Sequence, residues 1–319
     1  GNTGSRLISL DEKSESGAIK YRYDVNEDLS LGVISTLRQT DNYHNFVSGL
    51  DSKYRLDDSN SLQAQLLFAD TKDAAQFSAS GQEESFNDHA VKVQYEHDSE
   101  YWQIFAEHQS IGAKFRADLG FMPRADYQKN KVLVNRFIYG EPDSAWQEMK
   151  FAGQWQILHN ENGELLERSI STSFNIDGPM LSMFDVMLVT ADKVGLRRHE
   201  LDFTLPIDNS IDGNTKRFQE NQAVFYTTIQ PTAQIRTDLE LTLGDKIDYD
   251  NDRLGDITAL YGNISYNVNK HLEFEFSHTY SDLAADGAKV YSENLTELRV
   301  SYQFNVNSPL LNGRLGAYH

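Results

Sequence analysis

Three aspartates at alternate positions are the residues in this chain best spaced to hold a metal ion. They stand in one acidic stretch, which contains Asp248, Asp250, Asn251, Asp252, Gly255 and Asp256. Oxygen atoms at alternate positions suit Ca²⁺. An EF-hand loop would add a bidentate glutamate at its twelfth position and a helix on each side, and this stretch has neither. Asp248, Asp250 and Asp252 are therefore a weak calcium candidate, and the sequence favours a solvated acidic loop.

The remaining residue types give little sign of catalysis. The nine histidines are dispersed and none forms a His-x-x-x-His or His-Glu-x-x-His pair, so no histidine metal site is indicated. Ser277 precedes His278, but neighbouring residues of a strand point to opposite faces. No Gly-x-Ser-x-Gly or phosphate-binding glycine motif is present. We expect no enzyme activity and no cofactor, and keep a barrel-embedded hydrolase built on His278 as an unlikely alternative.

A glycine-, proline- and aromatic-containing segment, residues 112–127, is the loop with the most specific chemistry. Gly112 and Gly120 permit unusual backbone angles, and Pro123 fixes its own φ and donates no hydrogen bond. Such a loop can fold inward and narrow a pore, or it can pack against the rim with Arg124 satisfying wall carboxylates. The residues proposed for a plug or constriction are Phe115, Gly120, Phe121, Pro123, Arg124 and Asp126.

The elements that must position these residues are strands. In 258–269, Leu260, Ile264 and Tyr266 take one face, while Asn263 and Ser265 take the other. A period of two puts successive side chains on opposite faces of a strand. The same pattern predicts sixteen strands near 17–25, 29–39, 43–56, 61–72, 88–98, 101–111, 128–140, 145–158, 165–176, 180–191, 217–230, 232–247, 257–268, 270–282, 291–304 and 309–318.

The connections between these strands alternate between short and long. Short ones are predicted at 26–28, 57–60, 99–100, 141–144, 177–179, 305–308 and near Pro231 and Asn269. Longer ones are predicted at 73–87, 112–127, 159–164, 192–216, 248–256 and 283–290, and 40–42 is the exception that stays short. The alternation of short and long connections places 196–206 within the long connection 192–216, because a strand there would put every later short turn on the wrong rim. Short turns on one rim and long loops on the other are typical of outer-membrane barrels.

Parity also bears on the two ends of the chain. A closed barrel usually has an even number of strands, so we expect one strand before Gly1 and at least one after His319. The complete barrel would then have 16–18 strands, and a barrel of that size leaves a water-filled lumen unless something plugs it. The fold class predicted is therefore all-β, a large antiparallel transmembrane β-barrel with about sixteen strands visible.

Three features favour a membrane barrel over a soluble β-sandwich, which stays an alternative. The strands are long, aromatic residues recur at strand ends, and the polar face carries charges and amides. The terminal aromatics are Tyr21, Tyr23, Tyr54, Tyr95, Tyr101, Trp102, Tyr266, Tyr302 and Phe304. Cations on the polar face either tune ion selectivity or brace the wall through ion pairs; they include Lys20, Arg22, Lys53, Arg55 and Lys92.

Composition limits the class of protein. The chain has 319 residues, a formal net charge of −19 and no cysteine. The acidic balance argues against nucleic acid, and the lack of cysteine excludes disulfides and cysteine-based zinc sites. No apolar run approaches the eighteen residues of a membrane helix, which does not make the chain soluble. No linker or change of composition divides the sequence, so we predict one domain over 1–319.

The segment around 112–127 also resembles part of a known family. Ile111-Gly112, an aromatic, and then Gly120-Phe121-Met122-Pro123-Arg124-Ala125-Asp126 match a barrel found in bacterial outer-membrane proteins. That barrel follows a family 9 carbohydrate-binding-like module and is a domain of unknown function. Further resemblance runs through 32–56 and 222–304 and covers most of the chain. The amino-terminal module and the first and last barrel strands of the family are absent, so sugar recognition is not carried over.

The function predicted from these observations is a pore, a conduit or a translocation partner in the bacterial outer membrane. It would have a polar lumen and long extracellular loops. The alternative is a non-conducting surface barrel for glycan binding or adhesion. The expected partners are outer-membrane lipid and lipopolysaccharide, and a periplasmic carbohydrate-binding-like module or another envelope protein, with no nucleic acid.

Overall fold

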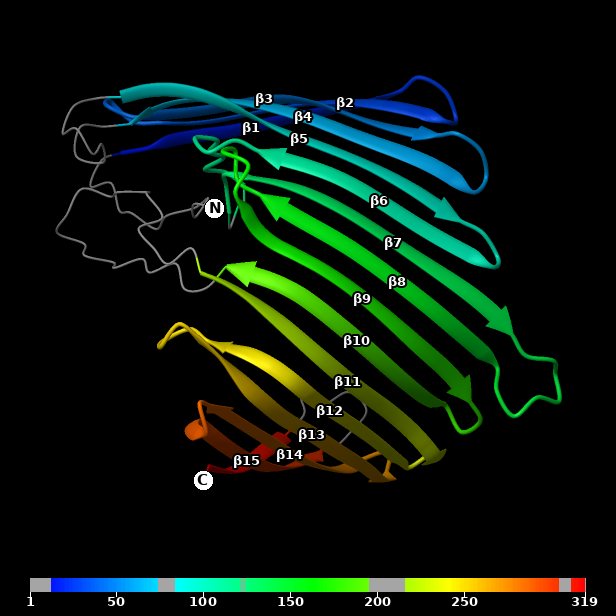
Figure 1. Cartoon of the computed structure of the whole chain (residues 1–319). Helices are drawn as coiled ribbons and strands as arrows, with labels where there is room; N and C mark the ends of the chain where they lie inside the picture. Colours follow the sequence, from blue (N-terminus) through cyan, green and yellow to red (C-terminus); the bar gives the residue numbers. More distant parts are fainter. Residues whose placement is uncertain are drawn as a thin grey trace. The chain divides into compact units, whose positions relative to one another are not determined.

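The computed structural model describes residues 13–73, 84–120, 122, 124–194, 216–303 and 311–318. Its strands form one antiparallel sheet in which every strand lies beside its neighbours in sequence, from β1 to β16 (Figure 1). The described residues contain no helix that is long and apolar enough to cross a membrane. The prediction of an all-β, antiparallel chain with about sixteen strands is confirmed.

The strands are mostly longer than those of soluble sheets, as the alternation predicts. Their bounds are β1 Glu15–Asp24, β2 Leu29–Gln39, β3 His44–Arg55, β4 Asn60–Asp73, β5 Glu84–Asp98, β6 Trp102–Ile111, β7 Tyr127–Tyr139, β8 Glu148–His159, β9 Leu165–Gly178, β10 Ser182–Val194, β11 Arg217–Thr232, β12 Ile235–Asp248, β13 Arg253–Asn269, β14 Leu272–Ala285, β15 Ala288–Tyr302 and β16 Leu311–Tyr318.

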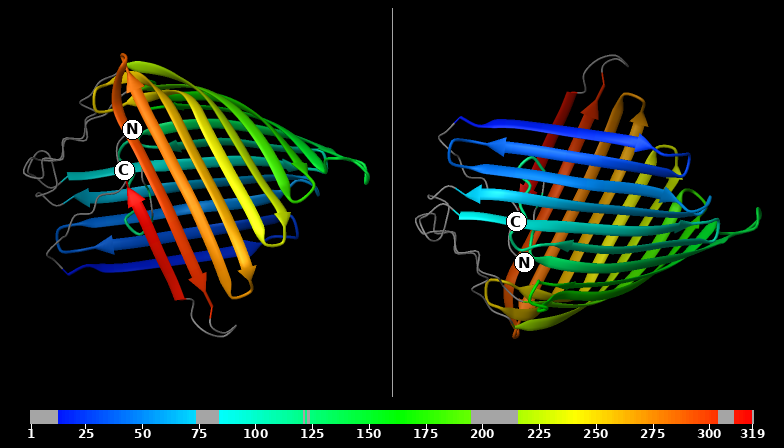
Figure 2. Two further views of the ribbon diagram at one scale, coloured as in Figure 1. Left: turned by 90° about the horizontal axis from the view of Figure 1, so that it is seen from below. Right: turned by 90° about the horizontal axis from the view of Figure 1, so that it is seen from above.

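The chain divides into two compact units. Unit 1 consists of Gly1–Val134, Trp155–Arg168 and Leu196–Thr215, and unit 2 of the remaining residues. Within unit 1, β1 to β6 pair in order without a register shift, and the ribbon arrows alternate in direction (Figure 2). Within unit 2, β10 to β16 pair in the same way, with small irregularities near some strand ends.

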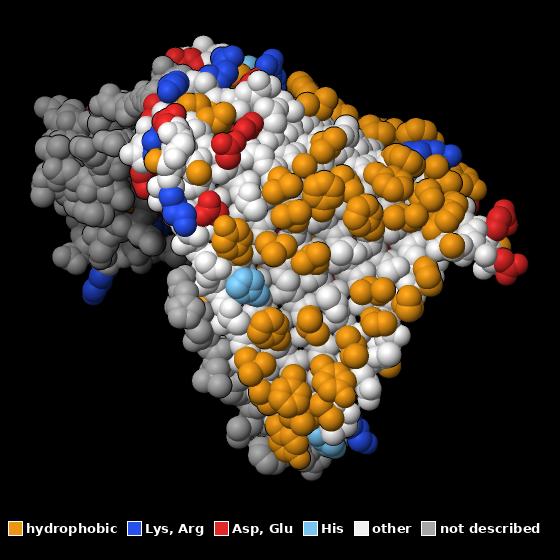
Figure 3. All heavy atoms as spheres, turned by 60° about the horizontal axis from the view of Figure 1, so that its bottom comes forward, with side chains coloured by type: hydrophobic (Ala, Val, Ile, Leu, Met, Phe, Trp, Pro, Cys, Tyr) orange, Lys and Arg blue, Asp and Glu red, His pale blue; other side chains and the backbone are white. Residues whose placement is uncertain are grey.

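Each unit has an apolar face on which large side chains remain exposed. In unit 1 they include Tyr21, Val33 and Leu50, and in unit 2 Leu239 and Phe276. The space-filling view shows hydrophobic side chains spread over the strands, while charged ones lie mostly near strand ends (Figure 3). An exposed apolar area of this extent marks a surface that meets lipid or a partner. We call the opposite side of each unit its polar face.

Two connections that the sequence predicts as long are tight turns. β12 runs to Asp248 and β13 begins at Arg253, while only Asp286 and Gly287 separate β14 from β15. Positive φ angles at Asp252, Asp286 and Gly287 allow the chain to reverse within so few residues. The predictions for 248–256 and 283–290 are therefore wrong. The connection from Tyr139 to Glu148 is longer than the turn predicted at 141–144.

Candidate functional site

The polar face of unit 1 is not polar throughout. Near the ends of β3 to β6 it carries an apolar patch, defined by Val47, Leu67, Ala69, Ala90 and Ile111. Register makes these residues neighbours: Val47 lies opposite Ala69, and Leu67 and Ile111 lie opposite Ala90. The patch therefore forms a continuous apolar surface across four strands, on the face where alternation predicts polar side chains.

The loop of residues 112–126, between β6 and β7, covers this apolar patch. Phe115, Met122 and Ala125 form one hydrophobic cluster with the patch, and Phe115 and Ala125 are each 2% exposed. Burying an aromatic ring and two smaller apolar side chains favours the docked loop by several kcal/mol, at roughly 25 cal/mol per Å² of apolar surface. Apolar contact thus holds the loop against the wall.

A single buried amide aligns the loop on the wall. Asn45, which is 2% exposed, donates from Nδ2 to the carbonyl oxygen of Arg116 at 3.1 Å. Its Oδ1 accepts from the backbone N–H of Asp118 at 3.0 Å. The same Nδ2 also donates to Thr71 Oγ1 at 2.9 Å. Asn45 therefore satisfies two backbone groups of the loop that burial would otherwise leave unpaired.

Tyr43 and Arg38 add a second contact to the tip of this loop. The Tyr43 hydroxyl donates to Asp118 Oδ2, and the Arg38 guanidinium lies 3.7 Å from the same oxygen. Burial of Tyr43, together with its hydrogen bond to the Asp118 carboxylate, raises the pKa of the phenol well above its usual range. The phenol is therefore a neutral donor at ordinary pH.

A charged contact fixes the middle of the loop to the end of β4. Arg116 forms an ion pair with Asp73, whose carboxylate is almost completely buried, and its guanidinium lies 4.9 Å from the centre of the Phe86 ring. A buried carboxylate needs a partner of this kind, because removal of the cation would leave an uncompensated charge.

The base of the loop depends on a glycine. The Gly112 carbonyl accepts from the N–H groups of Phe115 and Asp126, while its own N–H donates to His89. A Cβ at Gly112 would lie 2.0 Å from Asp88 Oδ1. Asp88 in turn accepts from the N–H of Lys114 at 2.8 Å. Only glycine leaves room for this carboxylate to hold the first turn of the loop.

The structure places most of the predicted constriction residues in this docked loop. Phe115 is buried in its contact with the wall, and Gly120 donates its N–H to Ala117. The Arg124 guanidinium lies 5.9 Å from the Tyr127 ring centre. Asp126 adopts a φ of 59° and accepts from the N–H of Glu161 at 3.0 Å. Phe121 and Pro123 lie outside the described residues. A constricting role for the six stays a prediction.

Sequence reasoning missed the wall residues that receive the loop. The alternation predicts the strands of these residues, but it does not predict that they receive the loop. They are Val47, Ala69, Ala90 and Asn45. One signal was available: 66–69 reads Leu-Leu-Phe-Ala, which is apolar at consecutive positions of a strand. One face of this strand carries the exposed Phe68, so apolar side chains on its other face indicate a second contact, which the loop supplies.

Beyond the apolar patch, the polar face of unit 1 carries charges and amides. Arg22 lies 3.8 Å from Asp51, and both Lys92 and Lys129 form ion pairs with Glu107, at 3.4 and 2.6 Å. Arg55 pairs with Asp28 at the neighbouring turn. Several of the predicted polar-face cations therefore engage in wall ion pairs, which leaves a further role in selectivity open.

The polar face of unit 2 carries more acidic than basic side chains. Arg236 pairs with Asp238, whose carboxylate also accepts from the Tyr226 hydroxyl, and Arg299 lies 3.6 Å from Glu275. The register of β12 to β15 puts further acids on this face, so that it carries Asp238, Glu240, Glu273, Glu275 and Glu297. This face is acidic, as the net charge of the chain leads one to expect.

The calcium candidate is organised around an arginine. Asp248 accepts from Arg253 Nε at 2.9 Å and from Asn251 Nδ2 at 2.8 Å. Asp250 is exposed, and Asp252 has a positive φ in the turn. Across the described ranges, no three His, Cys, Asp or Glu side chains are grouped so that they would hold a metal ion. The side chains of Asn251 and Arg253 thus stabilise a turn by hydrogen bonds to Asp248, and calcium binding stays a prediction.

His278 does not meet a serine on the polar face. Its Nδ1 lies 2.9 Å from Thr296 Oγ1, and alternation places it on the apolar face with the exposed Phe276. Ser277 takes the other face, opposite Glu297. Among the described residues the hydroxyl beside His278 is that of Thr296, so the hydrolase alternative has no serine paired with this histidine.

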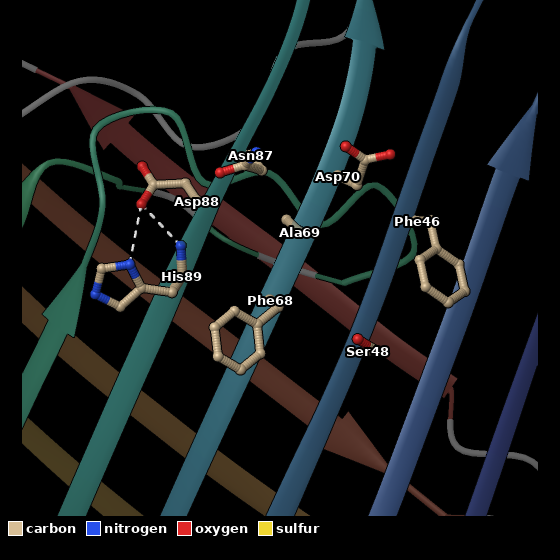
Figure 4. Close-up of a pocket in the computed structure, with 8 residues that line it drawn as sticks. All are labelled: Phe46, Ser48, Phe68, Ala69, Asp70, Asn87, Asp88 and His89. Atoms are coloured by element: carbon tan, nitrogen blue, oxygen red, sulfur yellow. Dashed lines mark hydrogen bonds and ion pairs between the residues drawn. The ribbon is translucent and has the colours of Figure 1, made fainter.

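A pocket of about 360 Å³ lies at the ends of β3 to β5. The rings of Phe46 and Phe68 and the imidazole of His89 project beside one another there, and a dashed line joins His89 to Asp88 (Figure 4). Phe46 and Phe68 are exposed on the apolar face, so this pocket opens on the side opposite to the apolar patch.

Comparison with known proteins supports the fold. No family model matches the chain, and no curated protein matches it in sequence. Among solved structures, copper transporter OprC aligns with a TM-score of 0.53 at 8% identity, covering 91% of this chain and 56% of its own. This chain thus spans about half the length of OprC.

Two further solved structures align over nearly their whole length. OccAB3 of Acinetobacter baumannii gives a TM-score of 0.49 at 9% identity, covering 96% of this chain and 92% of its own. OmpF of Salmonella typhi, in complex with daunomycin, gives 0.41 at 12%, covering 95% and 90%. These scores lie below 0.5, so the assignment of fold rests on OprC.

These neighbours are outer-membrane β-barrels, transporters and porins. The chain therefore has the fold of that class, an all-β antiparallel meander, which agrees with the predicted fold class. The finer resemblance, to a barrel that follows a carbohydrate-binding-like module, stays a prediction.

Proposed function

We propose that this chain forms a β-barrel conduit in the bacterial outer membrane, with its polar face lining an aqueous path that the 112–126 loop narrows. The observation that carries the proposal is the docking of this loop on the polar face, through Phe115 and Asn45. A loop on the apolar face would interrupt contact with lipid, whereas a loop on the polar face occupies the space available to solute. The exposed apolar face supports a lipid-facing role.

The partners of this proposal follow from the two faces. Outer-membrane lipid and lipopolysaccharide would contact the apolar face, and a periplasmic module or envelope protein would use a rim. The copper named for OprC is not part of the proposal, because a likeness at 8% identity carries the fold alone.

Conductance in planar lipid bilayers tests the proposal. The wild-type protein, refolded and shown by heat-modifiable gel migration to be folded, should pass a steady current. The variant Phe115→Ala/Asn45→Ala, which frees the loop, should pass a larger single-channel current. Phe46→Ala, which removes a ring from the other face, is the matched control and should leave the current unchanged.

The opposite outcomes are equally clear. If folded wild type and folded loop variant both pass no current, the conduit is excluded and a non-conducting surface barrel for glycan binding or adhesion takes its place. A protein that is monodisperse without detergent would contradict the membrane location itself.

A further inference from the structure

The polar face of unit 1 has more cations than carboxylates beyond the apolar patch. We define this part as the cation-rich area, and its cations are Lys20, Arg22, Lys53, Lys92, Lys129 and Lys131. The acids on the same face are Asp24, Asp51, Glu96, Asp98 and Glu107. Arg55, which pairs with Asp28 of a turn, is a further cation there. In a chain whose net charge is −19, and whose unit 2 has an acidic polar face, this excess is local and opposite in sign.

The ion pairs in this area leave positive charge uncompensated. Lys92 and Lys129 share one carboxylate, that of Glu107, so the group of three carries a net positive charge. Arg22 reaches Asp51 only at 3.8 Å and its side chain is 54% exposed. Within the described part of the chain, no ion pair engages Lys20 or Lys53, and both are exposed.

Neutral hydrogen-bond donors stand between these cations. Gln63 lies opposite Lys53 in the register, and Gln65 and Gln109 lie opposite Lys92 on its two sides. The Lys131 ammonium lies 5.9 Å from the Phe105 ring centre, a contact that leaves its N–H groups available. Ammonium and amide donors on one surface match the oxygens of carboxylates and phosphates.

We propose that the cation-rich area of β1 to β7 binds small anionic solutes, carboxylates or phosphates, on their way past the 112–126 loop. The inference rests on the proposed conduit and names its class of solute. An excess of cations on a wet face raises the local concentration of anions within about 10 Å, the screening length at 0.1 M salt. Rings of such side chains set ionic preference in other pores.

Block of the bilayer current by added anions tests this inference. Sodium citrate and inorganic phosphate are the two probes, in a potassium chloride background. Each should reduce the wild-type current saturably. The triple variant Lys20→Gln/Lys53→Gln/Lys131→Gln, in which no residue takes part in a described ion pair, should need about tenfold more of the effective probe for half block. Lys270→Gln, the same change in an exposed turn of unit 2, should behave as wild type.

The possible results separate the inference from the function on which it rests. Block by citrate alone assigns carboxylates, and block by phosphate alone assigns phosphates. Equal half-block concentrations in the wild type and the triple variant overturn the inference while the conduit stands. If no variant conducts, the conduit fails, and calorimetric titration of the detergent-solubilised protein with both probes decides the inference. Binding that is lost in the triple variant upholds it, and binding that is unchanged or absent overturns it.

Discussion

The apolar patch and the cation-rich area lie on one face of the same strands, and they differ in what lies over them. On β5 a single step of alternation leads from Ala90, in contact with the 112–126 loop, to Lys92, which pairs with Glu107. On β3 the change takes two steps, from Val47 through Gly49 to Asp51. The boundary between the two areas is therefore also the edge of the loop.

This difference shows what a departure from alternation means. The period of two gives each strand its two faces, and it says nothing of what covers a face. A polar face that becomes apolar over four adjacent strands must be covered, because exposed apolar area facing water is unfavourable. The loop and the patch thus pack as one unit, whereas Lys20 and Lys53 of the charged area beside them are exposed.

The largest expected effect comes from removing the Phe115 ring, which packs in one cluster with the apolar patch. Phe115→Ala should destabilise the docked loop by about 3–5 kcal/mol, the cost of removing a buried aromatic ring in other proteins. The measurement is hydrogen exchange of the loop amides in protein reconstituted in lipid. Phe46→Ala, from the opposite face of β3, should leave loop exchange unchanged. Equal loss of protection in both variants would mean that the patch does not hold the loop.

Removal of the Asn45 side-chain amide, which bonds two backbone groups of the loop, should have the next largest effect. Asn45→Ala leaves the Arg116 carbonyl and the Asp118 N–H without their partner, which costs about 2–3 kcal/mol of docking energy. The Asp118 amide should lose protection before the rest of the loop. Asn42→Ala in the exposed turn nearby is the control. Unchanged exchange at Asp118 would refute the role assigned to Asn45.

Two glycines, Gly112 in the loop of unit 1 and Gly153 in a strand of unit 2, differ in the space around them. Gly112→Ala should push Asp88 away from the Lys114 N–H and destabilise the loop base by about 1–2 kcal/mol, as overpacking does. Gly153→Ala in β8, where a Cβ meets nothing within 4 Å, should be neutral or slightly stabilising. Thermal unfolding of both variants checks this, and equal melting temperatures would contradict it.

The strands could be predicted from the sequence because their signal is local. Alternation alone gave the sixteen elements and, with the rule of short turns, their antiparallel order. The turns at 249–252 and 286–287 could not be predicted, because they depend on positive φ angles at aspartates that composition does not reveal. Phe115 is a candidate from its loop, yet the hydrophobic cluster that it forms with Val47 and other wall residues joins parts of the chain far apart in sequence. No pattern within one strand specifies such a pair.

The smallest effect concerns the phenol at the loop tip, and it depends on pH. Because the pKa of folded Tyr43 lies above that of an unfolded tyrosine, about 10, its stabilisation is complete below that pH and is lost as pH rises further. Tyr43→Phe should cost about 1 kcal/mol at pH 7, the value of one hydrogen bond, and should show less alkaline loss than wild type. Urea unfolding in lipid vesicles between pH 8 and 11 measures both, with Tyr54→Phe on the apolar face as control. If the wild type and Tyr43→Phe lose stability in parallel above pH 10, the contact with Asp118 does not fix the loop, and the apolar patch alone separates the covered area from the open one.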